Sequence, residues 1–464
     1  MNTDGWTQTM GAGPLLAIAA VAVALLLFLI VKLRVHAFLA LVLVSVLTAF
    51  ATGIPSSAIV DTLTDGFGST LASVALLVGL GAMLGRLVEV SGGAQALTDA
   101  LISRFGEKRA PLALGVASLV FGFPIFFDAG LVVMLPIVFT VARRLGGGVL
   151  RYALPVAGAF SVMHVFVPPH PGPVAASGLL GADPGLVIAL GLLVGIPTWY
   201  LSSYLFGLWA GKRFVLPVPD ILSGGEQAEH DENPPKPSTV LLLLLLPLVL
   251  IFMNTGLDMA SQSGWVDGDA SWVGFLRAVG ATPIALLITV LVASVVLGTA
   301  RGRSKDMVEK LLNSALAPVC AVILITGAGG MFGAVLRAGG IGDALSGAMA
   351  DLGVPVILAA FLIAGALRVA QGSATVALTT AAGIVQPLVV LGDYNGGQLA
   401  AIVLALSAGS VIASHVNDSG FWLVGRFLNM DVKTTLKTWT VLETLIGVIG
   451  FALAWAVFGV ASTV

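Results

Sequence analysis

The stretch SHVNDSGFW, residues 414–422, decides how this chain is to be interpreted. It places His415, Asn417, Asp418 and Ser419 in a segment that is otherwise apolar enough to lie in a membrane. Polar groups at that depth cost several kcal/mol each unless they are satisfied, and they commonly line a solute pathway. Asn, Asp, Ser and Gly also favour turns, so the stretch predicts a helix broken inside the membrane. A short loop between two spans is the alternative interpretation.

The composition indicates the class of protein. Of 464 residues, 58% are hydrophobic and 10% are charged, and the mean hydropathy is +1.04. About a quarter of the residues of a soluble domain are charged. So much apolar surface indicates a polytopic helical membrane protein. The net charge of −2 gives no indication of nucleic-acid binding, and the single cysteine, Cys320, is expected to be a packing residue.

Apolar runs predict ten spans and two re-entrant helical hairpins. The spans are expected near 14–31, 36–53, 69–90, 152–180, 185–211, 239–256, 281–300, 312–336, 398–428 and 439–461. Two of these spans, 152–180 and 398–428, are expected to be broken helices. The hairpins are expected at 111–142 and 355–391, because each contains two short apolar arms joined by a polar tip with glycine.

The distribution of basic residues favours this topology. Lys and Arg residues gather on one side of the membrane, at 32–34, 104–109, 143–151, 212–213, 236, 301–310 and 426–437. The opposite loops carry aspartates, with Arg277 and Arg337 as their only cations. This asymmetry requires each hairpin to return to the side from which it enters. It also predicts that both termini are non-cytoplasmic.

The chain repeats its order of elements. Residues 79–97 and 327–345 match at seven of nineteen positions, from Gly79 with Gly327 to Leu97 with Leu345. Each half has three spans, a hairpin, a broken span and a last span. Because five crossings are an odd number, the second half is expected to be inverted, as in many secondary transporters. The predicted domains are an N-terminal half (1–211), a cytoplasmic linker (212–238) and a C-terminal half (239–464).

The hairpin tips carry candidate binding groups. Asp128 follows Phe127 at the start of the second arm of the first hairpin, where it can meet a helix N-terminus or act as its N-cap. Arg368 is the only cation of the second hairpin, and it needs a carboxylate from a substrate or from the protein, with Asp128 as the structural alternative. The helix after Gly372 presents free N–H groups to an anion. Further donors near this tip are Gln371, Ser373 and Thr375.

Histidines and isolated glutamates are the remaining titratable groups. The prolines of HVFVPPHPGP, residues 164–173, hold His170 in an unwound segment. His164, His170 and His415 are candidates for carrying a proton or for structural hydrogen bonds. Glu89 and Glu443 lie near predicted span ends and are expected to reach water.

Four motifs in the same order resemble the gluconate permease family of bacterial carboxylate:proton symporters. They are FFDAGLVVMLPIVF (126–139), VPPHPGP (167–173), RVAQGSATVA (368–377) and SHVNDSGFW (414–422), and the resemblance extends from about residue 14 to 461. It implies an inner-membrane symporter that imports D-gluconate or a related small hydroxy acid. It also implies the elevator-type fold of the ion transporter superfamily, and a homodimer.

The resemblance and the chemistry together predict the roles of the site residues. The predicted substrate-binding residues are Arg368, Gln371, Gly372, Ser373, Thr375, His170, Asn417, Ser419 and Phe127. The predicted proton-coupling residues are Asp128, Asp418 and His415. No enzymatic activity, cofactor, metal or nucleic-acid partner is expected. The alternatives are a sodium-coupled carboxylate carrier, or a proton symporter of the same family for D-serine, L-idonate or glycerate.

Single cysteines test the predicted topology. Placed at 104–110, 143–151, 212–238 or 301–310 after Cys320 is replaced, they should resist an impermeant thiol reagent applied to right-side-out cells, because the basic residues there face the cytoplasm. Ready labelling at 143–151 would contradict the assignment of the first hairpin.

Overall fold

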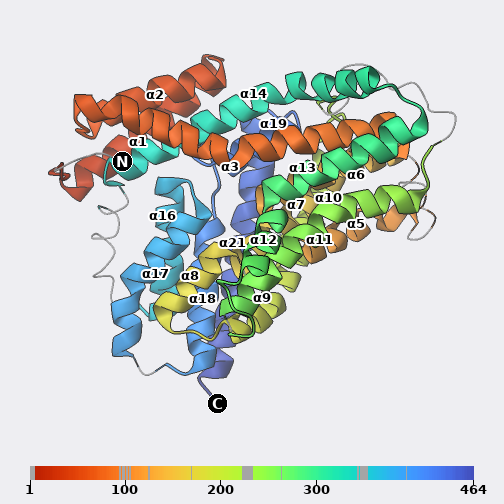
Figure 1. Cartoon of the computed structure of the whole chain (residues 1–464). Coiled ribbons are helices and arrows are strands. Elements are labelled where there is room, and N and C mark those ends of the chain that lie inside the picture. Colours follow the sequence, from red (N-terminus) through yellow and green to blue (C-terminus); the bar gives the residue numbers. More distant parts are fainter. Residues whose placement is uncertain are drawn as a thin grey trace. The chain divides into compact units, whose positions relative to one another are not determined.

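The described part of the chain is helical, as its composition indicates. The computed structural model describes residues 6–93, 96, 100, 103, 106–123, 126–168, 170–221, 234–262, 264–341, 344, 354–392 and 394–463. These residues contain helices and turns but no strand (Figure 1). Four predicted features lie wholly or partly outside the described residues: linker residues 222–233, Pro124 of the first tip, Pro169 of the proline-rich break, and the repeat match of Leu97 with Leu345.

The helices follow one another with short connections. Those of the first half are α1 (Ala12–Leu27), α2 (Ala37–Ala51), α3 (Ser56–Val90), α5 (Ala110–Gly122), α6 (Phe127–Leu145), α7 (Leu150–Phe166), α8 (Pro171–Leu180), α9 (Pro184–Thr198) and α10 (Phe206–Arg213). Those of the second half are α11 (Pro237–Gln262), α12 (Ser271–Gly280), α13 (Thr282–Ala293), α14 (Lys305–Ala338), α16 (Val356–Gln371), α17 (Ala374–Leu391), α18 (Gly396–Val411), α19 (Ser419–Phe427), α20 (Val432–Thr435) and α21 (Val441–Ala461). Short π-helical segments are η1 (Phe28–Lys32), η3 (Trp199–Leu205), η4 (Ser294–Gly298) and η6 (Leu436–Thr440), and 3₁₀ turns are η2 (Glu107–Arg109) and η5 (Thr299–Arg301).

Eight helical stretches within the described residues are long and apolar enough to cross a membrane. They are Ala12–Ile30, Ser56–Val90, Leu150–Leu180, Pro184–Arg213, Pro237–Asp258, Thr282–Arg301, Val319–Ala338 and Val432–Ala461. A span needs about 20 apolar residues. The predicted spans 36–53 and 398–428 fall on shorter helices, since α2 has 15 residues and α18 has 16. Many membrane crossings are thus shown.

Two helices differ from the spans that hydropathy predicts. α3 begins at Ser56, well before the predicted start at residue 69, because Asp61 and Asp65 interrupt the apolar run without interrupting the helix. Both aspartates are exposed. The short helix α12 is not predicted at all, because its ten residues are too few for a span.

From α3 onwards, helices recur in the second half about 248 positions later. α3 ends at Val90 and α14 at Ala338, a separation of 248 residues (338 less 90). The same shift carries the bounds of α5, α6, α7 and α8 to within three residues of those of α16, α17, α18 and α19. It carries Pro184–Arg213 onto Val432–Ala461. A repeat accounts for this correspondence, and its inversion across the membrane stays a prediction.

The chain forms two compact units, and each takes segments from both halves. The first unit contains Met1–Ala72, Ser161–Ser203 and Val322–Val464, and the second contains Ser73–Phe160 and Tyr204–Ala321. The helices α3, α7 and α14 each contribute to both units. The compact units are therefore not the two sequence halves.

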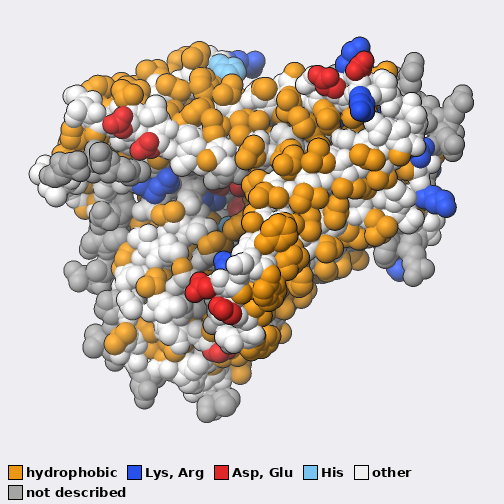
Figure 2. Space-filling model, in the orientation of Figure 1, with side chains coloured by type: hydrophobic (Ala, Val, Ile, Leu, Met, Phe, Trp, Pro, Cys, Tyr) orange, Lys and Arg blue, Asp and Glu red, His pale blue; other side chains and the backbone are white. Residues whose placement is uncertain are grey.

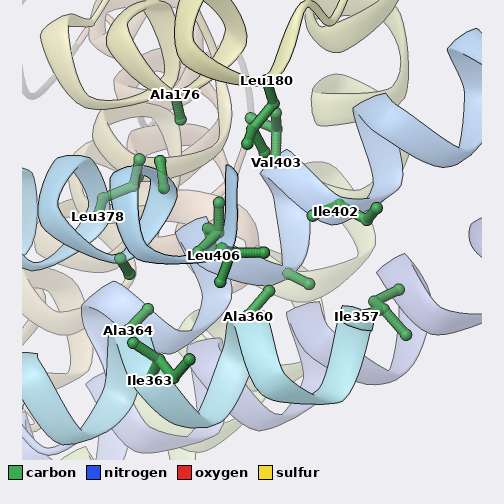
Figure 3. Close-up of a cluster of buried hydrophobic side chains, with 14 of the residues drawn as sticks. Ala176, Leu180, Ile357, Ala360, Ile363, Ala364, Leu378, Ile402, Val403 and Leu406 are labelled. Carbon is green, nitrogen blue, oxygen red and sulfur yellow. The ribbon is translucent and has the colours of Figure 1, made fainter. Parts of the chain in front are cut away.

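The core of the first unit surrounds α18. Residues Ala400 to Val411 of this helix are all buried, and α18 packs against α16, α17, α21, α9 and α8. Figure 3 shows Leu180 of α8 beside Val403, and Ala360 of α16 near Leu406. A helix that is apolar on every side belongs in an interior. α18 is therefore the central element of this unit, and the break that follows it starts from a buried position.

The core of the second unit joins α3, α11 and α13. Its largest described cluster contains Leu84, Leu87, Val88, Val240, Leu243, Leu244, Val290, Ala293, Leu297 and Val308. A smaller cluster places Ala129 and Val133 of α6 among Ile251, Ala285 and Leu286.

Large apolar side chains also cover much of the outer surface. Figure 2 shows them in long stretches with few charges between them. Examples are Leu242, Phe275 and Val390, which are 68%, 67% and 75% exposed. A soluble monomer rarely shows apolar patches of this extent. Lipid contact accounts for such a surface.

Candidate functional site

A glycine turn forms the second hairpin tip. α16 ends at Gln371, and Gly372 follows with φ +75°, a conformation that glycine adopts without a Cβ clash. The N–H of Gly372 donates to the carbonyl of Arg368 at 3.0 Å. Ser373 then caps α17, and its hydroxyl accepts from the N–H of Val376 at 3.4 Å. The helix therefore breaks within the motif RVAQGSATVA.

Arg368 is buried at this tip and already has a carboxylate partner. Its Nη2 lies 2.5 Å from Oδ2 of Asp418, and its Nη1 donates to the carbonyl of Gly372 at 2.5 Å. The structural partner considered from the sequence was Asp128, but the structure pairs Arg368 with Asp418. This ion pair connects the end of α16 to the break between α18 and α19. A substrate carboxylate is thus not needed to neutralise Arg368.

Asp418 is the N-cap of α19, and its carboxylate has three donors. Besides Arg368, the hydroxyl of Ser414 donates to Oδ2, and the N–H of Gly420 donates to Oδ1 at 2.9 Å. Hydrogen bonds of this kind favour the ionised form of a carboxylate. The turn residues of SHVNDSGFW therefore satisfy one another inside the protein.

The segment between α18 and α19 is bonded to its neighbours on both sides. The carbonyl of Val369 in α16 accepts from Nδ2 of Asn417 at 2.8 Å and lies 2.9 Å from Nε2 of His415. Ala413 has φ +49°, which costs a residue with a Cβ about 1–2 kcal/mol. Its N–H donates to the hydroxyl of Thr444 in α21 at 3.2 Å. Contacts to α16 and α21 thus hold this segment out of helical conformation.

The proline-rich break lies in the same unit. α7 ends at Phe166 and α8 begins at Pro171, with the buried His170 as the N-cap. The ring centroids of His164 and His170 are 5.0 Å apart. α8 packs along α17. The break and the second hairpin tip are therefore neighbours in the fold.

The first hairpin tip belongs to the other unit. α6 begins at Phe127, its N-cap is Phe126, and Asp128 lies in its first turn. The interpretation of Asp128 as the N-cap is therefore wrong, although its position still favours a negative charge at the helix N-terminus. The convergence of all four breaks on one site, and with it the roles of Phe127 and Asp128, stays a prediction.

Three buried polar atoms at the second tip have no partner among the described residues. They are Nε of Arg368, Oε1 of Gln371 and Oδ1 of Asn417. Ser373, Thr375 and Ser419 are partly buried at the starts of α17 and α19. A buried polar atom without a hydrogen bond typically costs about 1–3 kcal/mol. The site thus offers one donor and two acceptors to a solute.

Arg337 is a residue that the sequence analysis missed as part of this site. Its Nη1 donates to the carbonyl of Gln371 at 3.0 Å. No carboxylate of the described residues forms an ion pair with it. Sequence counts treated it only as a loop cation. Its place one helical turn after Gly333, in the repeated glycine segment, was the available signal.

Glu443 was also interpreted wrongly from the sequence. It was expected to reach water, but it is only 2% exposed, and its Oε2 accepts from the hydroxyl of Ser161 at 3.1 Å. Glu89 differs, because it pairs with Arg86 and Arg143 and keeps partial exposure. Hydropathy alone does not separate a carboxyl group at a span end from one inside the fold.

Many long apolar helices and an interior with broken helices define a polytopic membrane protein. The model of the GntP family permease matches residues 14–460. The chain belongs to this permease family, and it is therefore a transporter and not an enzyme.

Named relatives agree over most of the chain. The inner membrane permease YgbN of Escherichia coli K12 is 38% identical over 96% of this chain and 99% of its own. A gluconate permease of Pseudomonas aeruginosa is 39% identical over 90% and 91%. The Gnt-II system L-idonate transporter of E. coli K12 is 36% identical over 90% and 92%. These relatives support a multi-pass protein of the bacterial inner membrane.

The buried ion pair can be tested by removing one or both of its charges. Arg368→Gln should lower the free energy of unfolding by roughly 3–5 kcal/mol, because Asp418 is then buried without its cation. The double variant Arg368→Gln/Asp418→Asn should recover most of this loss. Thermal unfolding of the purified protein in detergent measures both effects.

The exposed pair of Arg277 with Asp258 supplies the control. Arg277→Gln should change the stability by about 1 kcal/mol or less. Equal losses in the single and double variants at the buried site would show that the ion pair is not what stabilises the tip.

Proposed function

We propose that this protein imports gluconate, or a related small hydroxy acid, together with a proton. The observation that carries the proposal is the set of unmet polar atoms beside a charge pair that is already neutral. Hydroxyl groups of a polyhydroxy acid can donate to Oε1 of Gln371 and Oδ1 of Asn417, and one hydroxyl oxygen can accept from Nε of Arg368. The gluconate and L-idonate transporters among the relatives support this substrate class.

The substrate carboxylate needs a cation that the protein has not already neutralised. Arg368 is paired with Asp418, so we assign to it the shaping of the tip. Arg337 is the remaining cation beside Gln371, and it also lines a cavity of about 500 Å³ with Trp6 and Gln8. The N-terminus of α17 adds free N–H groups close by. Arg337 and α17 together are the proposed carboxylate site.

Proton coupling follows from the charge of the substrate. Gluconate is an anion at neutral pH, and moving one negative charge inward against 100 mV costs about 2.3 kcal/mol. One proton per substrate cancels that charge. Sodium coupling is the second candidate, because amide and hydroxyl oxygens at the tips can also bind Na⁺. The described residues contain no cluster of three or more His, Cys, Asp or Glu side chains that would hold a metal ion.

Further features of the transporter remain part of the proposal. We propose that the two halves are inverted repeats, that both termini are non-cytoplasmic, and that the protein moves its site as an elevator within a homodimer. The recurrence of helix bounds between α3–α10 and α14–α21 supports the repeat.

Uptake into proteoliposomes tests the function. We expect labelled gluconate to accumulate when the external solution is acidic, and not to accumulate when a sodium gradient is imposed at equal pH. Competition by L-idonate, glycerate and D-serine on the same vesicles ranks the substrates. Accumulation on sodium alone would favour the sodium-coupled carrier, and no uptake of any hydroxy acid would refute the proposal.

The role of Arg337 is tested by substitution. Arg337→Gln should weaken gluconate binding roughly tenfold to hundredfold, as expected for the loss of a charge-assisted hydrogen bond, and Arg337→Lys should retain part of it. The apparent KM should rise more than the maximal rate falls. Arg277→Gln removes an exposed cation and serves as the control. An unchanged KM in Arg337→Gln would assign the carboxylate to another group.

A further inference from the structure

Glu443 is a buried carboxyl group that the proposed substrate site does not use. It lies near the start of α21, and its residue is 2% exposed. One hydroxyl, that of Ser161 in α7, donates to its Oε2 at 3.1 Å. Its Oε1 has no hydrogen-bond partner among the described residues. The group thus has a single neutral donor, in contrast to the three donors of Asp418.

The charges around Glu443 do not neutralise it. Arg368 and Asp418 act on it through space, but they already form an ion pair with each other. The helices α18 and α9, which pack against α21, have no titratable side chain. In η6 the only charged residue, Lys437, is exposed. α7 contributes His164, one turn beyond Ser161.

A carboxyl group in these surroundings is suited to carrying a proton. Burial without a cation disfavours the carboxylate relative to the neutral acid. The neutral acid satisfies Oε2 through Ser161 and needs no counterion. Ionisation then requires access to water or a change in the surrounding charges, which is the property that a coupling site needs.

The helix that carries Glu443 is bonded directly to the break beside the substrate site. Within α21 and η6, the hydroxyl of Thr440 donates to the carbonyl of Ser414 at 2.5 Å, and the indole N–H of Trp439 donates to the Ser414 hydroxyl at 2.9 Å. Thr444 accepts from the N–H of Ala413, the residue with φ +49°. Glu443 therefore lies between two residues that hold the break in place, and Ser414 in turn donates to Asp418.

We propose that Glu443 is the group that binds the co-transported proton. One proton joins the carboxylate on the side of high proton concentration, crosses as part of the neutral carboxylic acid, and leaves to water on the other side. The substrate is not altered. Contacts of α21 with the break link the protonation of Glu443 to the geometry of the tip. This inference rests on the proposed proton symport.

Glu443→Gln tests the proposal in proteoliposomes. The amide keeps the shape of the protonated acid and the contact with Ser161, but it cannot release a proton. Exchange of labelled for unlabelled gluconate should continue within about threefold of wild type, whereas accumulation driven by a pH gradient should be lost. Glu309→Gln makes the same chemical change at an exposed position and should retain both activities.

The outcomes separate this inference from the proposed function. If the wild-type protein itself does not accumulate gluconate on a pH gradient, the proposed symport fails before the variants are compared. If wild type accumulates gluconate and Glu443→Gln does so equally, Glu443 is not the coupling group, and Asp128 or His415 takes its place.

A second measurement decides the case in which Glu443→Gln loses exchange as well. Gluconate binding to the purified protein in detergent should depend on pH in wild type, because proton and substrate binding are linked. Binding that no longer varies with pH in Glu443→Gln supports the proposal, and binding that keeps the wild-type pH dependence overturns it. Absence of binding, with a melting temperature that matches wild type, also counts against it, since a coupling group alone should not be required for binding at low pH.

Discussion

The ion pair of Arg368 with Asp418 is the interaction on which the site depends. It joins the end of α16 to the N-cap of α19, so that two helix breaks that are 50 residues apart form one structure. Two buried charges stabilise a fold only when hydrogen bonds satisfy their remaining atoms. Here Gly372, Ser414 and Gly420 supply those bonds, and Nε of Arg368 is the exception.

Broken helices inside an apolar protein require that every freed backbone group find a partner. Side chains supply many of these partners. Ser373 and Asp418 cap the helices that begin at the breaks, Asn417 donates to the carbonyl of Val369, and Thr440 donates to that of Ser414. The cost of the breaks is thereby limited, and the few polar atoms left over are concentrated where a solute can use them.

Hydropathy and turn residues predicted most of the fold. The arms of both hairpins, the break after Phe166 and the break around Ser414–Asp418 lie within a few residues of their predicted positions. These features are local, because glycine, proline and capping residues act on their own segment. The start of α3 and the helix α12 were missed, since apolar length alone does not report helices that extend beyond the membrane or are too short to cross it.

The sequence by itself determined the class of the protein, its family, and where its helices break, because these depend on composition and on residues adjacent in the chain. Only the tertiary structure decided which charges are paired. It gave Arg368 the partner Asp418, left Arg337 without a carboxylate in the described residues, and buried Glu443 against Ser161. The physical reason is that an ion pair or a burial depends on distances between helices distant in sequence, and two carboxyl groups with the same local hydropathy can differ completely in those distances.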